Sequence, residues 1–538
     1  MATQAGTGHA DELTLTTDVL VIGGGLAGGW AATAAARSGA RVIVVDKGYF
    51  GTSGVTATAG PGHWWVPPEG TQRAAAVQER MARAFGLAEA AWMERIIDTT
   101  WQVLPTLSPH YQFPLDQSGR TYYRGLRGPE YLRALREQAE AAGVSILDHS
   151  PALELLVHDD GSVAGASGVQ RQVGSGRPWL IRAGAVILAT GGCAFRSRLL
   201  GSHNNTGDGY LMGVEAGAEL SGMELSNYHT VALADTSQTR SASYSFADFF
   251  DADGNTLPSG GRPDYTTSLA RALLRGPVYA TLARTPRDLQ EAVPHIQPAF
   301  MLAFKRQGID PYTQRFAVTL HGEGTVRGVG GLRIATTDCQ TTVPGLFAAG
   351  DAASRELIAG ATSGGGNQNS AWALSSGVWS GRAAAARARS HQRLIQAPSR
   401  AVGRYGLHPA STPKPALDLE ALVQVVKDEL LPYDKVLFRH GARLAQSLER
   451  LDAAWRELSD HGFSQGVAAV KTRETAALVA SARWSYRAAL ERKESRGMHQ
   501  REDYPTTDPQ LARRLVTGGL DHVWTRFDGD NTRTWGHA

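Results

Sequence analysis

Three separated glycine-containing segments constrain the fold of this chain more than any other feature. They span residues 19–28, 186–192 and 345–351, and each begins with or contains a short apolar run. A short apolar run that ends in glycine is typical of a buried parallel strand followed by a tight turn. Three such units, in this order and this far apart, predict one α/β domain that the chain leaves and later re-enters.

The first segment predicts a dinucleotide site. Gly23 permits a tight turn, Gly25 lets the backbone approach a pyrophosphate, and Gly28 lets the following helix lie close to the strand. The N-terminus of that helix, predicted over residues 26–38, offers free N–H groups to phosphate. A second strand over residues 41–45 ends in Asp46, where an acid accepts hydrogen bonds from ribose hydroxyls.

Length, charge and cysteine content limit the classes of function. A chain of 538 residues is too long for one core, so two or three domains are expected. The net charge of +3 gives no reason to expect nucleic acid or an anionic membrane as a partner. The two cysteines, Cys193 and Cys339, are too few for a cysteine-only iron–sulfur cluster, and no metal site is predicted. No apolar stretch is long enough to insert into a membrane and no leader is evident, so we expect the cytoplasm.

Hydrophobic periodicity and turn signals change along the chain. Periodicity weakens and turn signals appear after residue 226, and several prolines follow residue 398. Helical spacing then returns, for example at Leu478, Ala482 and Tyr486. The predicted organisation is a disordered N-terminus (1–14), a cofactor domain in two parts (15–225 and 323–395), an inserted cap (226–322), a linker (396–415) and a C-terminal helical domain (416–538).

Three further segments carry a family resemblance. Residues 205–209 (Asn-Thr-Gly-Asp-Gly), 223–229 (Met-Glu-Leu-Ser-Asn-Tyr-His) and 493–505, which ends in Arg-Glu-Asp-Tyr-Pro, match family signatures. On these residues the chain resembles the flavoproteins of succinate dehydrogenase and fumarate reductase, with L-aspartate oxidase and adenylylsulfate reductase α as relatives. The resemblance covers about residues 15–235, 320–390 and 475–507.

The resemblance implies an α/β fold: a Rossmann-like FAD-binding domain with an inserted α+β cap domain and a C-terminal helical region. It also implies hydride transfer at flavin N5. Asp351 is expected to hydrogen-bond the ribityl chain, and the helix that opens near residue 366 is expected to face the flavin ring. The predicted cofactor contacts are Gly23, Gly25, Leu26, Ala27, Gly28, Asp46, Lys47, Ser53, Gly54, Thr190, Gly191, Gly192, Asp208, Gly350, Asp351, Gly366, Asn367, Asn369 and Ser370.

Three departures from the family pattern weaken a direct transfer of its chemistry. Gly54 stands where succinate dehydrogenases carry the histidine that binds flavin covalently, so non-covalent FAD is predicted; His63 is the nearby imidazole that could contradict this. Ser363 replaces an arginine that holds a substrate carboxylate, and a hydroxyl cannot replace a bidentate cation. Val326 stands where an active-site histidine is expected. The remaining catalytic candidates are His229, Arg327, His321 and Arg240.

Three hypotheses about function stay open at this point. The first is an FAD-dependent oxidoreductase acting on a small organic substrate other than a simple C4 dicarboxylate. The second is a flavoprotein similar to adenylylsulfate reductase α that exchanges electrons with a ferredoxin-like iron–sulfur partner. The third is a non-catalytic FAD-bound binding or assembly protein.

Overall fold

The computed structural model describes residues 12–115, 118–123, 125–238, 241–257, 264–407, 417–461 and 463–535. Most of the N-terminal segment predicted to be disordered, residues 1–11, lies outside the described residues, as do residues 408–416 of the predicted linker. The first strand begins at Leu13, inside the segment predicted to be disordered.

Parallel strands form the centre of the largest sheet and bring the three glycine segments together. β1 lies between β2 and β6, and β13 pairs with the other edge of β6. All four run in the same direction, so the turns that follow β1, β6 and β13 meet at one edge of the sheet. The bounds are β1 (Leu13–Ile22), β2 (Val42–Val45), β3 (Ser145–Leu147), β6 (Arg177–Leu188) and β13 (Leu346–Ala348). The antiparallel strands β4 (Ala152–Val157), β5 (Val163–Gln170) and β14 (Arg400–Ala401) complete this sheet.

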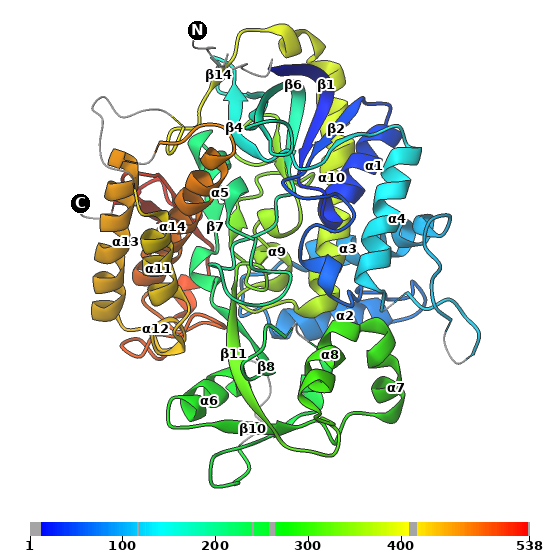
Figure 1. The fold of residues 1–538 in the computed structure, drawn as a ribbon, viewed down its shortest axis with the longest axis vertical. Helices are drawn as coiled ribbons and strands as arrows, with labels where there is room; N and C mark the ends of the chain where they lie inside the picture. Colours follow the sequence, from blue (N-terminus) through cyan, green and yellow to red (C-terminus); the bar gives the residue numbers. More distant parts are fainter. Residues whose placement is uncertain are drawn as a thin grey trace, which may run out of the picture.

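Two helices pack closely against each other beside this sheet (Figure 1). They are α1 (Leu26–Arg37) and α10 (Gly365–Ser390). A Cβ added at Gly377 would lie 2.5 Å from the carbonyl oxygen of Ala27, and one at Gly381 would lie 2.3 Å from that of Ala31. This close packing holds the N-termini of both helices near the turns that follow the strands. α4 (Gly128–Ala141) also packs against α1, and α3 (Ala90–Val103) against α10.

An inserted α+β unit lies at one end of the molecule, drawn in green in Figure 1. Its antiparallel sheet has the order β8-β11-β10-β9 and its own apolar core. The bounds are β8 (Tyr228–Leu233), β9 (Asp248–Phe250), β10 (Val278–Thr281), β11 (Phe316–Gly324), α6 (Asp264–Leu273), α7 (Arg287–Ile296) and α8 (Pro298–Gln307). The insertion corresponds to the cap predicted from the sequence, although β11 runs beyond its predicted limit at residue 322.

The C-terminal region is mainly helical but ends in strands. Its helices are α11 (Leu419–Leu430), α12 (Tyr433–Val436), α13 (Gly441–His461) and α14 (Ala468–Glu491). The strands β15 (Leu515–Gly518), β16 (Trp524–Phe527) and β17 (Thr534–Trp535) join β7 (Leu220–Ser221) and β12 (Gly331–Leu332). The helical character agrees with the C-terminal helical region predicted from the sequence, and valine, threonine and tryptophan favour the added strands. Along the described part of the chain, no helix has the length and apolarity needed to cross a membrane.

Candidate functional site

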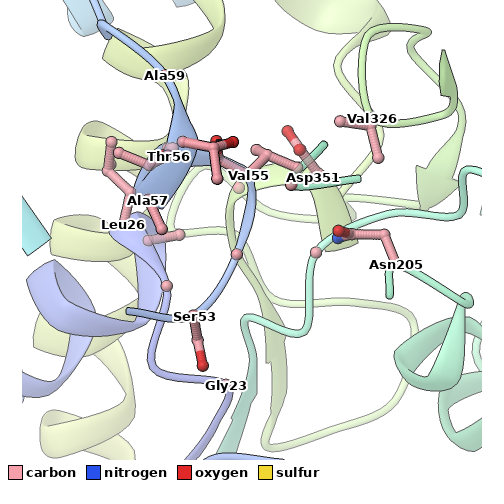
Figure 2. Close-up of a pocket in the computed structure, with 18 of the residues that line it drawn as sticks. Gly23, Leu26, Ser53, Val55, Thr56, Ala57, Ala59, Asn205, Val326 and Asp351 are labelled. Carbon is pink, nitrogen blue, oxygen red and sulfur yellow. Dashed lines mark hydrogen bonds between the residues drawn. The ribbon is translucent and has the colours of Figure 1, made fainter. Parts of the chain in front are cut away.

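A cavity of about 1030 Å³ opens where the three glycine turns meet. The turns contain Gly23, Gly191 and Gly350, whose φ angles are +107°, +77° and +64°. Side chains strain a backbone in this region, which explains glycine at each turn. Figure 2 shows Leu26 and Ala57 on one side of the cavity and Asn205 and Val326 on the other.

The first turn has the shape that a pyrophosphate requires. A Cβ at Gly28 would lie 1.8 Å from the carbonyl oxygen of Gly23, so the helix and turn are in direct contact. A Cβ at Gly25 would meet no atom within 4 Å. Gly25 lines the cavity at the N-terminus of α1, so the open space lies beside free backbone N–H groups. The residues at this end therefore fit a dinucleotide phosphate.

Asp46 holds this turn from the end of β2. Its carboxylate accepts hydrogen bonds from the backbone N–H groups of Gly24 and Gly48 and from the Ser53 hydroxyl, each at 2.6 Å. Asp46 and Ser53 both line the cavity. Each carboxylate oxygen can accept more than one hydrogen bond, so these contacts leave room for the ribose contact predicted from the sequence.

Lys47, the next residue, connects the cavity to the C-terminal helices. Its Nζ lies 2.8 Å from Asp208 and 3.0 Å from Glu474 of α14. Burial alone would lower the pKa of Lys47, but the two carboxylates raise it above its ordinary value. Lys47, Asp208 and Glu474 all line the cavity. Arg196 also pairs with Glu474, at 2.5 Å, so the charges at this end of the site are balanced by pairs within the protein.

Arg355 organises the part of the cavity wall around Asp351, and it is not among the residues predicted from the sequence. The side chain is buried, pairs with Asp351 and donates hydrogen bonds to the backbone carbonyls of Thr325 (2.7 Å), Val326 (3.1 Å) and Gly328. It thus fixes both the predicted ribityl contact and the loop that carries Arg327. The sequence offers one signal for this ion pair, because Arg355 follows Asp351 by four residues.

The N-terminus of α10 forms another wall. Gly366, Asn367, Asn369 and Ser370 line the cavity there. A Cβ at Gly366 would meet no atom within 4 Å. Among the described residues, neither the oxygen nor the nitrogen of the Asn369 side-chain amide finds a hydrogen-bond partner, although both atoms are buried. A bound ring with polar edges would satisfy such a group.

The remaining predicted cofactor contacts fall into two groups. Most of them line the cavity directly; these are Gly23, Leu26, Ala27, Gly54, Thr190, Gly191 and Gly350. Gly28 and Gly192 lie behind the turns instead. A Cβ at Gly192 would lie 2.4 Å from the Thr325 hydroxyl, so the lack of a side chain at Gly192 allows the turn to pack closely against Thr325.

The four catalytic candidates have different positions. Arg327 lines the cavity, and its guanidinium carbon lies 5.2 Å from the ring centroid of Tyr228, another lining residue. His229 and His321 are not among the described lining residues. Nδ1 of His229 lies 3.0 Å from the Asn227 carbonyl oxygen and its Nε2 lies 3.5 Å from that of Leu431.

His321 also contacts backbone, because its Nε2 lies 2.8 Å from the Thr236 carbonyl oxygen. Burial lowers the pKa of both His229 and His321, so the neutral forms are favoured. Arg240 lies outside the described residues. Of the three candidates that the structure describes, Arg327 is the one at the cavity wall.

His63, the imidazole closest in sequence to Gly54, does not reach the described lining. It is buried, and its Nε2 lies 3.1 Å from the Tyr131 hydroxyl. Burial lowers the pKa of His63 to about 3. Gly54 itself lines the cavity with a φ of +79°. The prediction of non-covalent FAD is compatible with these positions.

Several lining residues lie outside the predicted set. Tyr244 and Gln297 come from the cap, Asn205 comes from the segment before α5 (Asp208–Glu215), and Arg80 comes from α2 (Gln72–Ala82). Within the described ranges, no group of three or more histidine, cysteine, aspartate or glutamate side chains could hold a metal ion.

Comparison with known proteins identifies the family. The profile described as "FAD binding domain" matches residues 18–368, and "Fumarate reductase flavoprotein C-term" matches residues 430–522. L-aspartate oxidase of Streptomyces coelicolor is 27% identical over 570 residues, covering 96% of this chain and 93% of the relative. A fumarate reductase (CoM/CoB) polypeptide of Methanothermobacter marburgensis is 27% identical over 561 residues, covering 93% of this chain and 96% of the relative.

Solved structures agree on the fold. Quinol fumarate reductase of E. coli matches with a TM-score of 0.79 at 20% identity, covering 97% of this chain and 96% of that one. Adenylylsulfate reductase of Archaeoglobus fulgidus matches with a TM-score of 0.73 at 19% identity, covering 98% and 96%. The chain therefore belongs to the FAD-binding family of the succinate dehydrogenase and fumarate reductase flavoproteins, and it is an FAD-dependent oxidoreductase.

Proposed function

We propose that the protein transfers hydride between flavin N5 and a small organic substrate other than a simple C4 dicarboxylate. One observation carries the proposal. The predicted FAD contacts line or support the cavity, whereas residues expected to hold the substrate differ from the family pattern. Ser363 and Val326 replace an arginine and a histidine of the family pattern. A hydroxyl offers a single uncharged donor and an isopropyl group offers none, so neither replaces the cation or the imidazole that would hold a second carboxylate.

Bound FAD supplies the hydride chemistry, and the chain supplies position and exclusion of water. Arg355 and Asp351 hold the 325–328 loop against the cavity. The cap covers the site, since Gln297 lines the cavity and a Cβ at Gly60 would lie 2.8 Å from the Ile296 carbonyl oxygen. A covered site strengthens every electrostatic contact with the substrate. Arg327 then orients the substrate from the cavity wall.

The test begins with purified holoprotein. The flavin is reduced anaerobically by light, and candidate acceptors that include fumarate, 2-oxo acids and enones are added in turn. In the other direction, oxidised protein is mixed with succinate, L-aspartate and a panel of small hydroxy and amino compounds. We expect flavin turnover with a compound that is not a C4 diacid. High turnover with succinate or fumarate and with nothing else would reject the proposal.

A second function is electron exchange with a ferredoxin-like iron–sulfur partner, in the manner of adenylylsulfate reductase α. Two observations favour it. The chain has too few cysteines for a cysteine-ligated cluster of its own, and a relative of similar length is named as one of the subunits of a fumarate reductase. Slow reoxidation by air together with fast reoxidation by a two-cluster ferredoxin would support this function. Rapid reoxidation by air with formation of peroxide would instead indicate a stand-alone oxidase.

A further inference from the structure

Two tyrosines of the cap line the cavity, and their hydroxyl groups differ in their surroundings. Tyr244 is buried, and its hydroxyl donates a hydrogen bond to Oε1 of Gln238 at 2.5 Å. Tyr228 begins β8 and is half-buried. Among the described residues, the Tyr228 hydroxyl has no hydrogen-bond partner. Of these two phenols, Tyr228 is therefore the one whose proton no described group of the protein holds.

The pairing of β8 with β11 places Tyr228 beside the cofactor turns. Tyr228 lies opposite Gly324 in this pair, after an irregularity in the register between Gly322 and Gly324. Gly324 has a φ of +51°, and a Cβ there would lie 2.2 Å from the carbonyl oxygen of Cys193, which follows the second glycine segment. The end of the cap sheet that carries Tyr228 is thus in direct contact with the cofactor domain.

Arg327 accompanies Tyr228 on the cavity wall. Its guanidinium carbon lies 5.2 Å from the centroid of the tyrosine ring, a distance at which a cation is attracted to an aromatic face. Arg355 fixes this loop through hydrogen bonds to the Thr325 and Val326 carbonyls at 2.7 and 3.1 Å. A positive charge beside a phenol stabilises the negative charge that remains when the proton leaves. The surroundings of Tyr228 therefore suit proton transfer.

The other groups near this wall are poorer sources of a proton. Nδ1 of His229 and Nε2 of His321 contact backbone carbonyl oxygens, and neither imidazole is among the described lining residues. Thr230 and Ser245 line the cavity from the cap, but an aliphatic hydroxyl holds its proton far more tightly than a phenol does. The Arg327 guanidinium keeps its charge in proteins. A general acid has to lie within hydrogen-bond reach of the atom that it protonates, and a cavity wall provides that position.

We propose that Tyr228 is the residue that gives and takes the proton that accompanies hydride transfer. The inference rests on the proposed function, since it assigns a role in the same reaction. When an acceptor is reduced, its double bond opens, one of its atoms gains the hydride from flavin N5, and the neighbouring atom takes the proton of the Tyr228 hydroxyl. The O–H bond breaks, its electron pair stays on the phenolate oxygen, and water restores the proton. In the oxidising direction the same steps run in reverse, so the phenolate accepts the proton.

The fluorescence lifetime of the bound flavin tests the position of Tyr228 without a substrate. A phenol close to the flavin ring shortens this lifetime, because it donates an electron to the excited ring. Tyr228→Phe should therefore lengthen the lifetime of the holoprotein and leave its FAD content unchanged. Tyr433→Phe is the matched control, since this ring packs beside His229, with centroids 6.3 Å apart, and is not among the described lining residues. That variant should keep the wild-type lifetime.

Rapid mixing tests the chemical role. Photoreduced holoprotein is mixed anaerobically with fumarate, pyruvate and 2-cyclohexenone, and oxidised holoprotein with succinate, L-aspartate and the hydroxy and amino compounds. For each compound that reacts with the wild type, Tyr228→Phe should slow the change in flavin oxidation state roughly 100- to 10,000-fold, which is the contribution of a general acid or base. Binding of the compound and the flavin midpoint potential should stay unchanged, because the proton moves only in the transition state. Tyr433→Phe should react at the wild-type rate.

Four results would overturn the inference. An unchanged flavin lifetime in Tyr228→Phe would place the phenol away from the flavin ring. Wild-type rates in this variant would show that another group moves the proton. Weaker binding with an unchanged rate at saturation would show that Tyr228 holds the substrate instead. A longer lifetime in a protein whose flavin no donor reduces and no acceptor reoxidises would reject the proposed function, and the proton-transfer role with it.

Discussion

Asp46→Ala tests whether one carboxylate both builds the cofactor turn and contacts the cofactor. In the structure the side chain is 5% exposed and accepts three hydrogen bonds at 2.6 Å, from Gly24, Gly48 and Ser53. Two of these donors are backbone N–H groups in the segments that flank the cavity. The variant leaves all three without their acceptor.

The expected loss has two parts. A hydrogen bond to a charged group contributes about 1.5–3 kcal/mol, and three bonds that share one acceptor residue do not add fully. We therefore expect the free energy of unfolding of the apo form to fall by about 3 kcal/mol. Loss of the ribose contact and distortion of the turn should weaken FAD about 100-fold. At a fixed large excess of FAD, that weakening removes about 2.7 kcal/mol more from the stability of the holo form.

The assay compares three variants by denaturant unfolding with and without FAD, and by FAD titration of the apo protein. Ser53→Ala removes one donor to Asp46, so we expect a smaller loss in both measurements. Asp18→Ala is the matched control, because Asp18 binds the backbone N–H group of Arg41 at 2.8 Å on the same strand pair and is not among the described residues that line the cavity. That variant should lose stability and keep its FAD affinity.

One result would refute the reasoning. If Asp46→Ala retained wild-type affinity for FAD while its apo form lost stability as Asp18→Ala does, the carboxylate would be structural only. Unchanged stability with weakened FAD would instead refute the role of Asp46 in holding the glycine turn.

Three further outcomes are expected. Burial and the neighbouring Glu224 carboxylate raise the pKa of Glu356 from 4.5 to about 7. The folded protein thus binds this proton more tightly than the unfolded chain, so stability should fall as pH rises from about 4.5 to about 7, by on the order of 3 kcal/mol. Denaturant unfolding of Glu356→Gln across this pH range should show no such fall in stability. Arg355→Gln breaks the ion pair between the buried guanidinium and the partly exposed Asp351 carboxylate, and it should cost about 3 kcal/mol in unfolding free energy, with weaker FAD binding in the same titration. Acid precipitation should release all FAD to the supernatant, because Gly54 offers no side chain for attachment; a yellow pellet would contradict this.

The cofactor half of the site was predictable because local sequence determines it. A parallel strand that ends in glycine requires particular residues at fixed spacing, so residues 19–28, 186–192 and 345–351 each carried their own signal. Their convergence then followed from the pairing of β13, β6, β1 and β2 at one edge of the sheet. The fold class and the FAD cofactor predicted from these segments are confirmed by the structure and the family comparison.

The substrate half depends on tertiary placement, which leaves a weaker local signal. His229 lies between Tyr228 and Thr230 on β8, and those two neighbours line the cavity while His229 contacts the Leu431 backbone. Successive side chains of a strand point to opposite faces. His229 therefore points away from the face on which Tyr228 and Thr230 line the cavity. Arg80 lies in a helix among other charged residues, and no spacing distinguishes it from Arg83.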